Sequence, residues 1–274
     1  MMRFAWSGLL RVRVTAVYGS ILLYVNVTLL ALGPVMQNRV FRQASTNLHN
    51  FSHGHLGTLV VSAFVVDASP IALWLPALLC LLGLAELLWR SARLVVAFGV
   101  GHVGATVLVA AGLAAAVGLG WTSGAVTRAI DVGMSYGAVA VLGALTAAIP
   151  QRWRPAWIGW WAAVGITVVA VAREFTDVGH VVALVLGMLV ATRFGAPRPW
   201  TAVRAALLGI AATFAFMVIA NSVVEMMLAA PCGVAAVVMV EAVIRLRRHS
   251  GHGYGPGQQP RIDVGQCVGD RVVN

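Results

Sequence analysis

Apolar runs of about 20 residues recur along almost the whole chain, and they restrict the folds open to it. A helix of this length crosses the roughly 30 Å hydrocarbon core of a bilayer. Backbone amides inside lipid need hydrogen-bond partners in their own segment, so such runs must form helices. The chain is 60% hydrophobic and only 10% charged. We therefore predict an all-α fold, a polytopic transmembrane helix bundle.

The apolar runs predict eight spans, counted from an N-terminus on the inner side. Their expected bounds are residues 14–36, 70–89, 94–119, 130–149, 156–172, 178–194, 202–220 and 223–244. The apolar segment 56–66 is too short to span, so it should be a half-buried or interfacial element in the long first loop. We expect a cytoplasmic N-terminal segment (1–13), a membrane core (14–194), two additional transmembrane helices (195–245) and a disordered cytoplasmic tail (246–274).

The net charge of +10 comes from arginine alone, because the chain has no lysine. With the N-terminus inside, most arginines up to residue 248 fall in inner loops, and only Arg39, Arg42, Arg128 and Arg173 fall outside. This skew follows the positive-inside rule. We expect an integral protein of a bacterial plasma membrane with both termini cytoplasmic. The charge then reflects topology, and we expect no nucleic-acid partner.

A serine and a histidine lie at similar depths in two of the predicted spans. Ser135 is about five residues into the span 130–149, and His180 is a few residues into the span 178–194. Both spans run from outside to inside, so both side chains should lie roughly 5–10 Å from the outer face. Their depths therefore permit contact.

Stripes of small residues predict that these two spans pack closely. Glycine or alanine occurs at 179, 183, 187 and 191 in one span, and at 133, 137, 140 and 144 in the other. Small residues let membrane helices approach each other. We expect the Ser135 hydroxyl to come within about 3–4 Å of the His180 ring. An imidazole at that distance raises the nucleophilicity of a hydroxyl by accepting its proton.

These residues resemble the rhomboid family of intramembrane serine proteases. The run 133–137, Gly-Met-Ser-Tyr-Gly, is similar to the family's Gly-x-Ser-Gly at the start of the fourth span. His180 followed by Gly187 resembles the sixth span, and Glu86 resembles the carboxylate at the inner end of the second. The resemblance implies a six-helix core plus two C-terminal helices. It also implies Ser135 as nucleophile and His180 as general base, with no cofactor.

The chain departs from the family pattern at two points. Tyr136 stands where the second glycine of the motif is expected. Active members carry a His and an Asn in the second span, and the segment 70–89 contains neither. Loss of one oxyanion donor can cost about 10²–10³-fold in rate. Backbone N–H groups near Ser135, those of Gly133 and Met134, would have to hold the oxyanion instead.

Two functions follow from the resemblance. The first is an intramembrane serine protease that cleaves membrane-anchored substrates near the outer face through a Ser135–His180 dyad. The alternative is a catalytically inactive rhomboid-like protein that binds the transmembrane segments of client proteins through the same groove. The missing donors favour the alternative, whereas the retained serine and histidine favour the protease. The expected partners are transmembrane segments and the lipid bilayer in both cases.

Three further ionisable residues lie in or beside the predicted spans. Asp177 could orient His180, but a carboxylate in the first turn of a helix also offsets the helix dipole. We expect Asp131, at the start of the span 130–149, to offset the dipole of its own helix in the same way. His102 is expected to be buried and hydrogen-bonded, too far towards the inner face to share a site with Ser135. The three cysteines lack the spacing of a metal site. His49, His53 and His55 could bind a metal, but no carboxylate or cysteine accompanies them, which favours a solvated loop.

Overall fold

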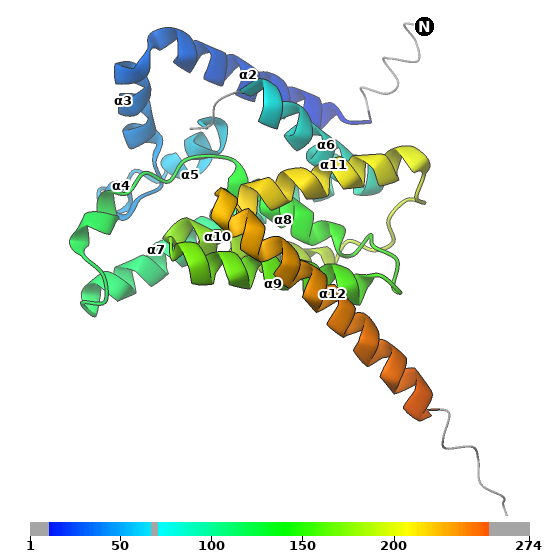
Figure 1. The fold of residues 1–274 in the computed structure, drawn as a ribbon. Coiled ribbons are helices and arrows are strands. Elements are labelled where there is room, and N and C mark those ends of the chain that lie inside the picture. Colours follow the sequence, from blue (N-terminus) through cyan, green and yellow to red (C-terminus); the bar gives the residue numbers. More distant parts are fainter. Residues whose placement is uncertain (1–10, 67–70, 252–274) are drawn as a thin grey trace, which may run out of the picture.

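The computed structural model describes residues 11–66 and 71–251, and every regular element in that part of the chain is helical. Six helices of this described part are long and apolar enough to cross a membrane: α2 (Arg13–Leu32), α6 (Ile71–Trp89), α7 (Ser91–Gly118), α9 (Arg154–Ala172), α11 (Ala202–Ile219) and α12 (Val223–Gly251). Two apolar helices are shorter, α8 (Ser135–Leu145) and α10 (Phe175–Ala191). The protein is an integral membrane protein built as a helix bundle (Figure 1).

Each of the eight predicted spans overlaps one of these helices, but only six of those in the described chain are long enough to cross a membrane, and several bounds differ. The span 14–36 ends early at Gly33, where φ is 77°, and Pro34 then opens α3 (Pro34–Ala44). Proline lacks an N–H and suits the first position of a helix, so the chain turns there. The helix in the predicted span 130–149 is only α8, which has 11 residues. At the C-terminus, α12 continues to Gly251, so the expected tail begins as helix, and residues 252–274 lie outside the described residues.

The long first loop folds into short helices that pack back onto α2. It contains α3, α4 (Leu48–Ser52), α5 (Thr58–Val61) and the 3₁₀ helix η1 (Ser62–Phe64). The Tyr18 hydroxyl donates to the Ala63 carbonyl at 2.6 Å, and the Asn26 side chain accepts from the Val66 amide at 3.2 Å. The predicted short element at 56–66 is confirmed. These bonds hold it against the bundle.

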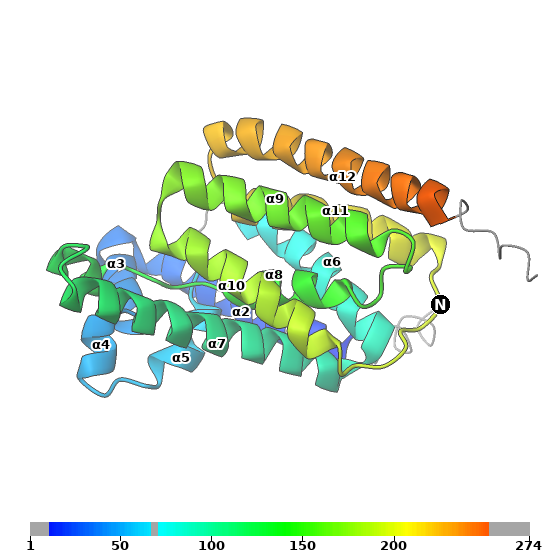
Figure 2. The same ribbon diagram turned by 90° about the horizontal axis from the view of Figure 1, so that it is seen from below.

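Helix α8 lies at the centre of the bundle, where it contacts α6, α7, α10 and α11 (Figure 2). Every residue from Tyr136 to Leu145 is buried. Glycine makes this enclosure possible. A Cβ on Gly187 of α10 would collide with the Ala140 carbonyl of α8, and one on Gly143 with the Leu184 carbonyl of α10. The predicted close packing of these two helices through small residues is therefore confirmed.

The small-residue face expected on α8 is only partly correct. Ala140 and Gly143 do face α10, but Gly137 packs against the Phe98 ring of α7. Gly101 of α7 also lies against Ala140. Small residues therefore surround α8 on two sides, because two neighbouring helices, rather than one, press on its backbone.

A buried carboxylate joins the start of α2 to the end of α6. Glu86 is 0% exposed and accepts hydrogen bonds from the backbone amides of Val14 (3.0 Å) and Thr15 (2.9 Å). It also accepts from the hydroxyls of Thr15 (2.8 Å) and Ser91 (2.6 Å). Its charge offsets the positive end of the α2 dipole. Glu86 therefore connects α2, α6 and α7 at one end of the bundle.

Arginines gather at this same end, which we call the arginine end. Arg13 donates to Ser91, and Arg198 donates to the Leu87 carbonyl at the end of α6. The arginines that occupy it are Arg13, Arg90, Arg93, Arg152, Arg154, Arg193, Arg198 and Arg204. The first loop and the starts of α8 and α10 lie at the opposite end (Figure 1).

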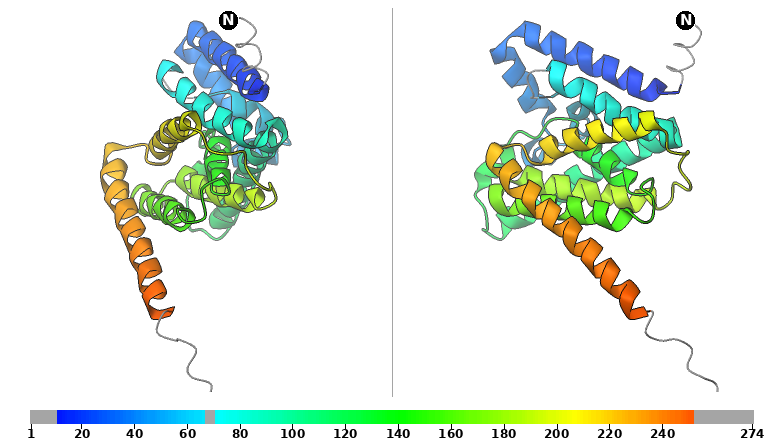
Figure 3. Two further views of the ribbon diagram at one scale, coloured as in Figure 1. Left: turned by 90° about the vertical axis from the view of Figure 1, so that its right-hand side faces the viewer. Right: turned by 45° about the vertical axis from the view of Figure 1, so that its right-hand side comes forward.

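The last two helices cover different parts of the bundle. Helix α11 packs on α6 and α8, whereas α12 packs along α9 (Figure 3). Gly233 of α12 lies against the Trp160 ring, and Gly159 of α9 lies against Val240. The C-terminal part of α12 extends away from the other helices (Figure 3).

Replacing Glu86 should destabilise the fold at the arginine end. In Glu86→Ala, two backbone amides and two hydroxyls lose a charged, buried acceptor, so the free energy of unfolding should fall by at least about 2 kcal/mol. Detergent titration followed by circular dichroism measures this change. Glu241→Gln, on a half-buried glutamate of α12, is the control and should stay near the parent value. Equal stabilities of Glu86→Ala and the parent would contradict the role given to Glu86.

Replacing Gly187 should disturb the contact between α8 and α10. The added methyl of Gly187→Ala meets the Ala140 carbonyl, which is part of the α8 backbone and cannot rotate away. The free energy of unfolding should fall by about 1–3 kcal/mol in the same titration. Gly112→Ala on α7 is the matched control, since no described atom lies within 4 Å of the added Cβ. A Gly187→Ala protein as stable as this control would contradict the packing.

Candidate functional site

Ser135 is the first residue of α8, and Met134 is its N-cap. Met134 makes no side-chain capping hydrogen bond to this helix start. The amides of the first turn have no acceptor inside the helix, and they carry the positive end of its dipole. Ser135 itself is half-buried. Its hydroxyl therefore lies beside N–H groups that suit a developing negative charge.

The segment before Ser135 is held by the first loop. Gly133 has a φ of 128°, which only glycine adopts readily, and it donates its N–H to the Ser62 carbonyl at 2.9 Å. Two residues earlier, the Asp131 amide donates to the Ser45 hydroxyl at 2.8 Å. The expected oxyanion role of the Gly133 amide does not agree with this geometry, because that N–H already has an acceptor. The amides of the first turn of α8 are the better candidates.

His180 lies on α10 and is buried, with 6% of the residue exposed. Among the described residues, neither ring nitrogen has a hydrogen-bond partner, so no hydrogen bond joins it to Ser135 in this structure. The side chain that meets His180 is Tyr136, whose ring stands edge-on to the imidazole with centroids 5.4 Å apart. Tyr136 fits there because Gly179 leaves space for its ring. The two helices thus meet as expected, but the residue after the serine faces the histidine.

Asp177 lies one turn before His180, in the first turn of α10. It is 1% exposed, and neither carboxylate oxygen has a hydrogen-bond partner in the described part of the chain. It therefore makes no hydrogen bond to His180, and its orienting role stays a prediction. Its place in the first turn lets it offset the α10 dipole, which is the second role that the sequence predicted for it.

Asp131 differs from the prediction made for it. It precedes α8 by four residues and so is not in the first turn of that helix. Its side chain accepts from the Thr46 hydroxyl at 3.2 Å, and its carbonyl accepts from the Thr46 amide at 2.9 Å. Asp131 therefore ties the first loop to the start of α8.

His102 lies closer to this region than the sequence suggested. Its Nε2 atom is 3.2 Å from the hydroxyl of Ser62, the residue whose carbonyl binds Gly133. Its neighbour Gly101 packs beside the Tyr136 carbonyl in the first turn of α8. The expectation that His102 is buried and hydrogen-bonded is confirmed. The first loop reaches inward to meet it, which counting along one span cannot reveal.

Three buried polar groups therefore gather where α8 and α10 begin. The Tyr136 hydroxyl, the Asp177 carboxylate and the His180 imidazole all lack partners within the described residues. Most buried polar atoms in proteins are hydrogen-bonded, so such a group calls for a functional or solvent-based explanation. Of these three groups, the sequence pattern predicts roles for His180 and Asp177, whereas Tyr136 stands out in it only as a departure from the family motif.

Protonation of Asp131 should make stability depend on pH. Burial raises the pKa of this carboxyl to about 6, although the hydrogen bond from Thr46 opposes the shift. The folded state therefore binds a proton more tightly than the unfolded state, and stability falls as pH rises from about 4 to about 6. The expected loss is at most about 2–3 kcal/mol. Asp131→Asn should flatten this part of the profile in detergent titrations at pH 4–7, and an unchanged profile would contradict the assignment.

Comparison with known proteins agrees with this architecture. Residues 10–195, more than half of the chain, match the family described as rhomboid-like protein. No curated protein and no solved structure gave a match. The matched region contains α2 to α10, and hence the first loop, Ser135 and His180. The chain belongs to the rhomboid-like protein family.

Proposed function

We propose that this protein is an intramembrane serine protease that cleaves membrane-anchored substrates near the end of the bundle where α8 and α10 begin. The observation that carries the proposal is the buried His180 imidazole without a partner on either nitrogen in the described chain. A histidine with only a structural role would be expected to hold a hydrogen bond, because burial of an unpaired polar group costs about 1–3 kcal/mol. A catalytic base must instead keep a nitrogen free for a proton.

The chemistry needs only the two side chains and the start of α8. The Ser135 oxygen attacks the carbonyl carbon of the substrate, and His180 takes the hydroxyl proton as general base. His180 then donates that proton to the leaving amine, and water hydrolyses the acyl-enzyme ester. A rotation of the Ser135 side chain, or a shift of Tyr136, must first bring the two groups into contact. Apo sites often need such tightening.

Backbone amides would stabilise the oxyanion. Helix α6 offers no histidine or asparagine, and the Gly133 amide is bound to Ser62. The amides of Met134 and Ser135 lie next to the attacking oxygen, and the dipole of α8 has its positive end there. Fewer donors imply slow cleavage, since each lost donor costs about 10²–10³-fold in rate.

Orientation in the membrane follows from the charge distribution. The arginine end would lie in the cytoplasm with both termini, and the start of α8 would lie near the outer face. Substrates would be proteins anchored by a transmembrane helix whose turns nearest the outer face unwind. An integral protein of a bacterial plasma membrane fits this arrangement.

A second function is favoured by the contact between Tyr136 and His180. The tyrosine ring meets the imidazole, and no hydrogen bond joins Ser135 to it among the described residues. A rhomboid-like protein without catalysis would tolerate this contact. Such a protein would bind client transmembrane segments and release them uncut.

Covalent labelling and cleavage distinguish these two functions. The full-length protein in lipid nanodiscs should react with a fluorophosphonate at Ser135 and should slowly cleave a substrate whose transmembrane helix is destabilised by glycine and proline. Ser135→Ala and His180→Ala should each reduce cleavage by at least about 100-fold, because the two groups act as one unit. Mass spectrometry locates the adduct.

Ser52→Ala supplies the matched control, since Ser52 is an exposed serine in α4 of the first loop. It should label and cleave like the parent protein. A parent protein that neither labels nor cleaves, yet crosslinks to the substrate helix, would establish the non-catalytic function instead.

A further inference from the structure

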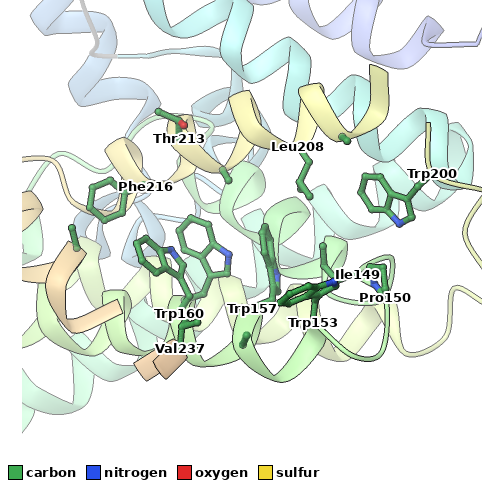
Figure 4. A pocket seen from close by; sticks show the side chains of 15 residues that line it. Ile149, Pro150, Trp153, Trp157, Trp160, Trp200, Leu208, Thr213, Phe216 and Val237 are labelled. Carbon is green, nitrogen blue, oxygen red and sulfur yellow. The ribbon is translucent and has the colours of Figure 1, made fainter. Parts of the chain in front are cut away.

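A tryptophan-lined cavity lies between α9, α11 and α12, away from Ser135 and His180. Its volume is about 660 Å³. Six of its 15 lining residues are aromatic: Trp153, Trp157, Trp160, Trp161, Trp200 and Phe216. Figure 4 shows Trp200 and Ile149 at one end of the cavity and Phe216 and Thr213 at the other. Almost all of its surface is carbon, so an apolar occupant fits it.

Hydrogen bonds fix two of the indole rings in place. The Trp157 Nε1 donates to the Thr146 hydroxyl at 3.1 Å, and the Trp200 Nε1 donates to the Ala148 carbonyl at 2.9 Å. Both acceptors belong to the turns that follow α8. The wall is therefore formed in advance, which reduces the entropy lost when a ligand binds.

The Trp200 end of the cavity is surrounded by arginine. The Arg152 guanidinium lies 5.5 Å from the centroid of the Trp153 ring, and Arg204 donates to the Pro199 carbonyl beside Trp200. Arg154 donates to the carbonyl of Ile149, a wall residue. The acids between residues 146 and 204 are Glu174 and Asp177, both at the opposite end of the bundle. On α12, Glu241 follows the wall residue Val237 by one turn, so one acid faces these three arginines. The Trp200 end of the cavity, which we call its mouth, is therefore positively charged.

We propose that this cavity binds one acyl chain of an anionic phospholipid, with Arg152 and Arg204 at the phosphate group. An apolar cavity that ends in arginines at the membrane surface matches the two parts of such a molecule. Its volume lies within the range of about 300–1,000 Å³ of small-molecule sites. A client helix of about 10 Å diameter crossing about 30 Å would need roughly 2,400 Å³, so a transmembrane helix does not fit.

Quenching of tryptophan fluorescence tests the site directly, because five of the nine tryptophans line the cavity. The full-length protein is placed in nanodiscs that contain phosphatidylglycerol or phosphatidylcholine with brominated acyl chains. Trp121, which is 79% exposed, is replaced by phenylalanine throughout to lower the background. Half-maximal quenching should need an at least threefold lower mole fraction of the anionic lipid than of the neutral lipid.

Two sets of variants locate the effect. Arg152→Gln combined with Arg204→Gln should abolish the preference for the anionic lipid, and Arg42→Gln combined with Arg128→Gln, at the other end of the bundle, should retain it. Ala212→Phe fills the cavity and should reduce quenching by both lipids. The arginine variants change side chains at the mouth and leave the buried core intact, so they remain informative if Ala212→Phe fails to fold.

Equal quenching by the two headgroups in the parent protein would overturn the proposal, since it would indicate ordinary contact with bulk lipid. Relief of quenching by an added transmembrane peptide would also overturn it, because the cavity would then hold a client helix. Neither outcome depends on proteolysis, so the lipid site and the proposed protease function are tested separately.

Discussion

The enclosure of α8 is the constraint on which the rest of the structure depends. A helix with every residue from Tyr136 to Leu145 buried needs neighbours whose backbones approach it directly. Gly101 and Gly187 supply that approach on two sides, because a methyl group at either position would strike α8 itself. The longer helices pack around α8, and the candidate site lies at the first turn of α8. Van der Waals contact, rather than the hydrophobic effect, holds such helices together in lipid.

The general arrangement of the helices was accessible from the sequence, because apolar length and glycine spacing are local properties. The start of α8 was not. Ile130 and Val132 extend its apolar run, yet hydrogen bonds to Ser45 and Ser62, far back in the chain, hold that segment out of the helix. The sequence also did not reveal that Tyr136 faces His180. Adjacent helical residues point about 100° apart, and the contacts of α8 with α7 and α10 decide which of them meets the imidazole.

In the candidate site the backbone is held in place, but the hydrogen bond between Ser135 and His180 is not formed. The first loop fixes the segment before Ser135 through Ser45, Thr46 and Ser62, and α10 fixes His180. The two reacting side chains are not bonded to each other in the described structure. Either the substrate draws them together, as in many enzymes whose sites tighten on binding, or the frame serves client binding alone. Both cases use the same loop and helices, which explains why family membership alone does not decide between them.

The 11 residues of α8 also bear on how the chain is assembled during synthesis. They rise only about 16 Å, roughly half the thickness of the hydrocarbon core, and a helix this short is marginal in isolation. Helix α7 leaves the ribosome before α8, but α10 is made only after the whole of α9. Stable insertion of α8 must therefore wait for a partner that arrives two helices later. The central helix of the folded bundle therefore gains its full packing only after α10 has been made.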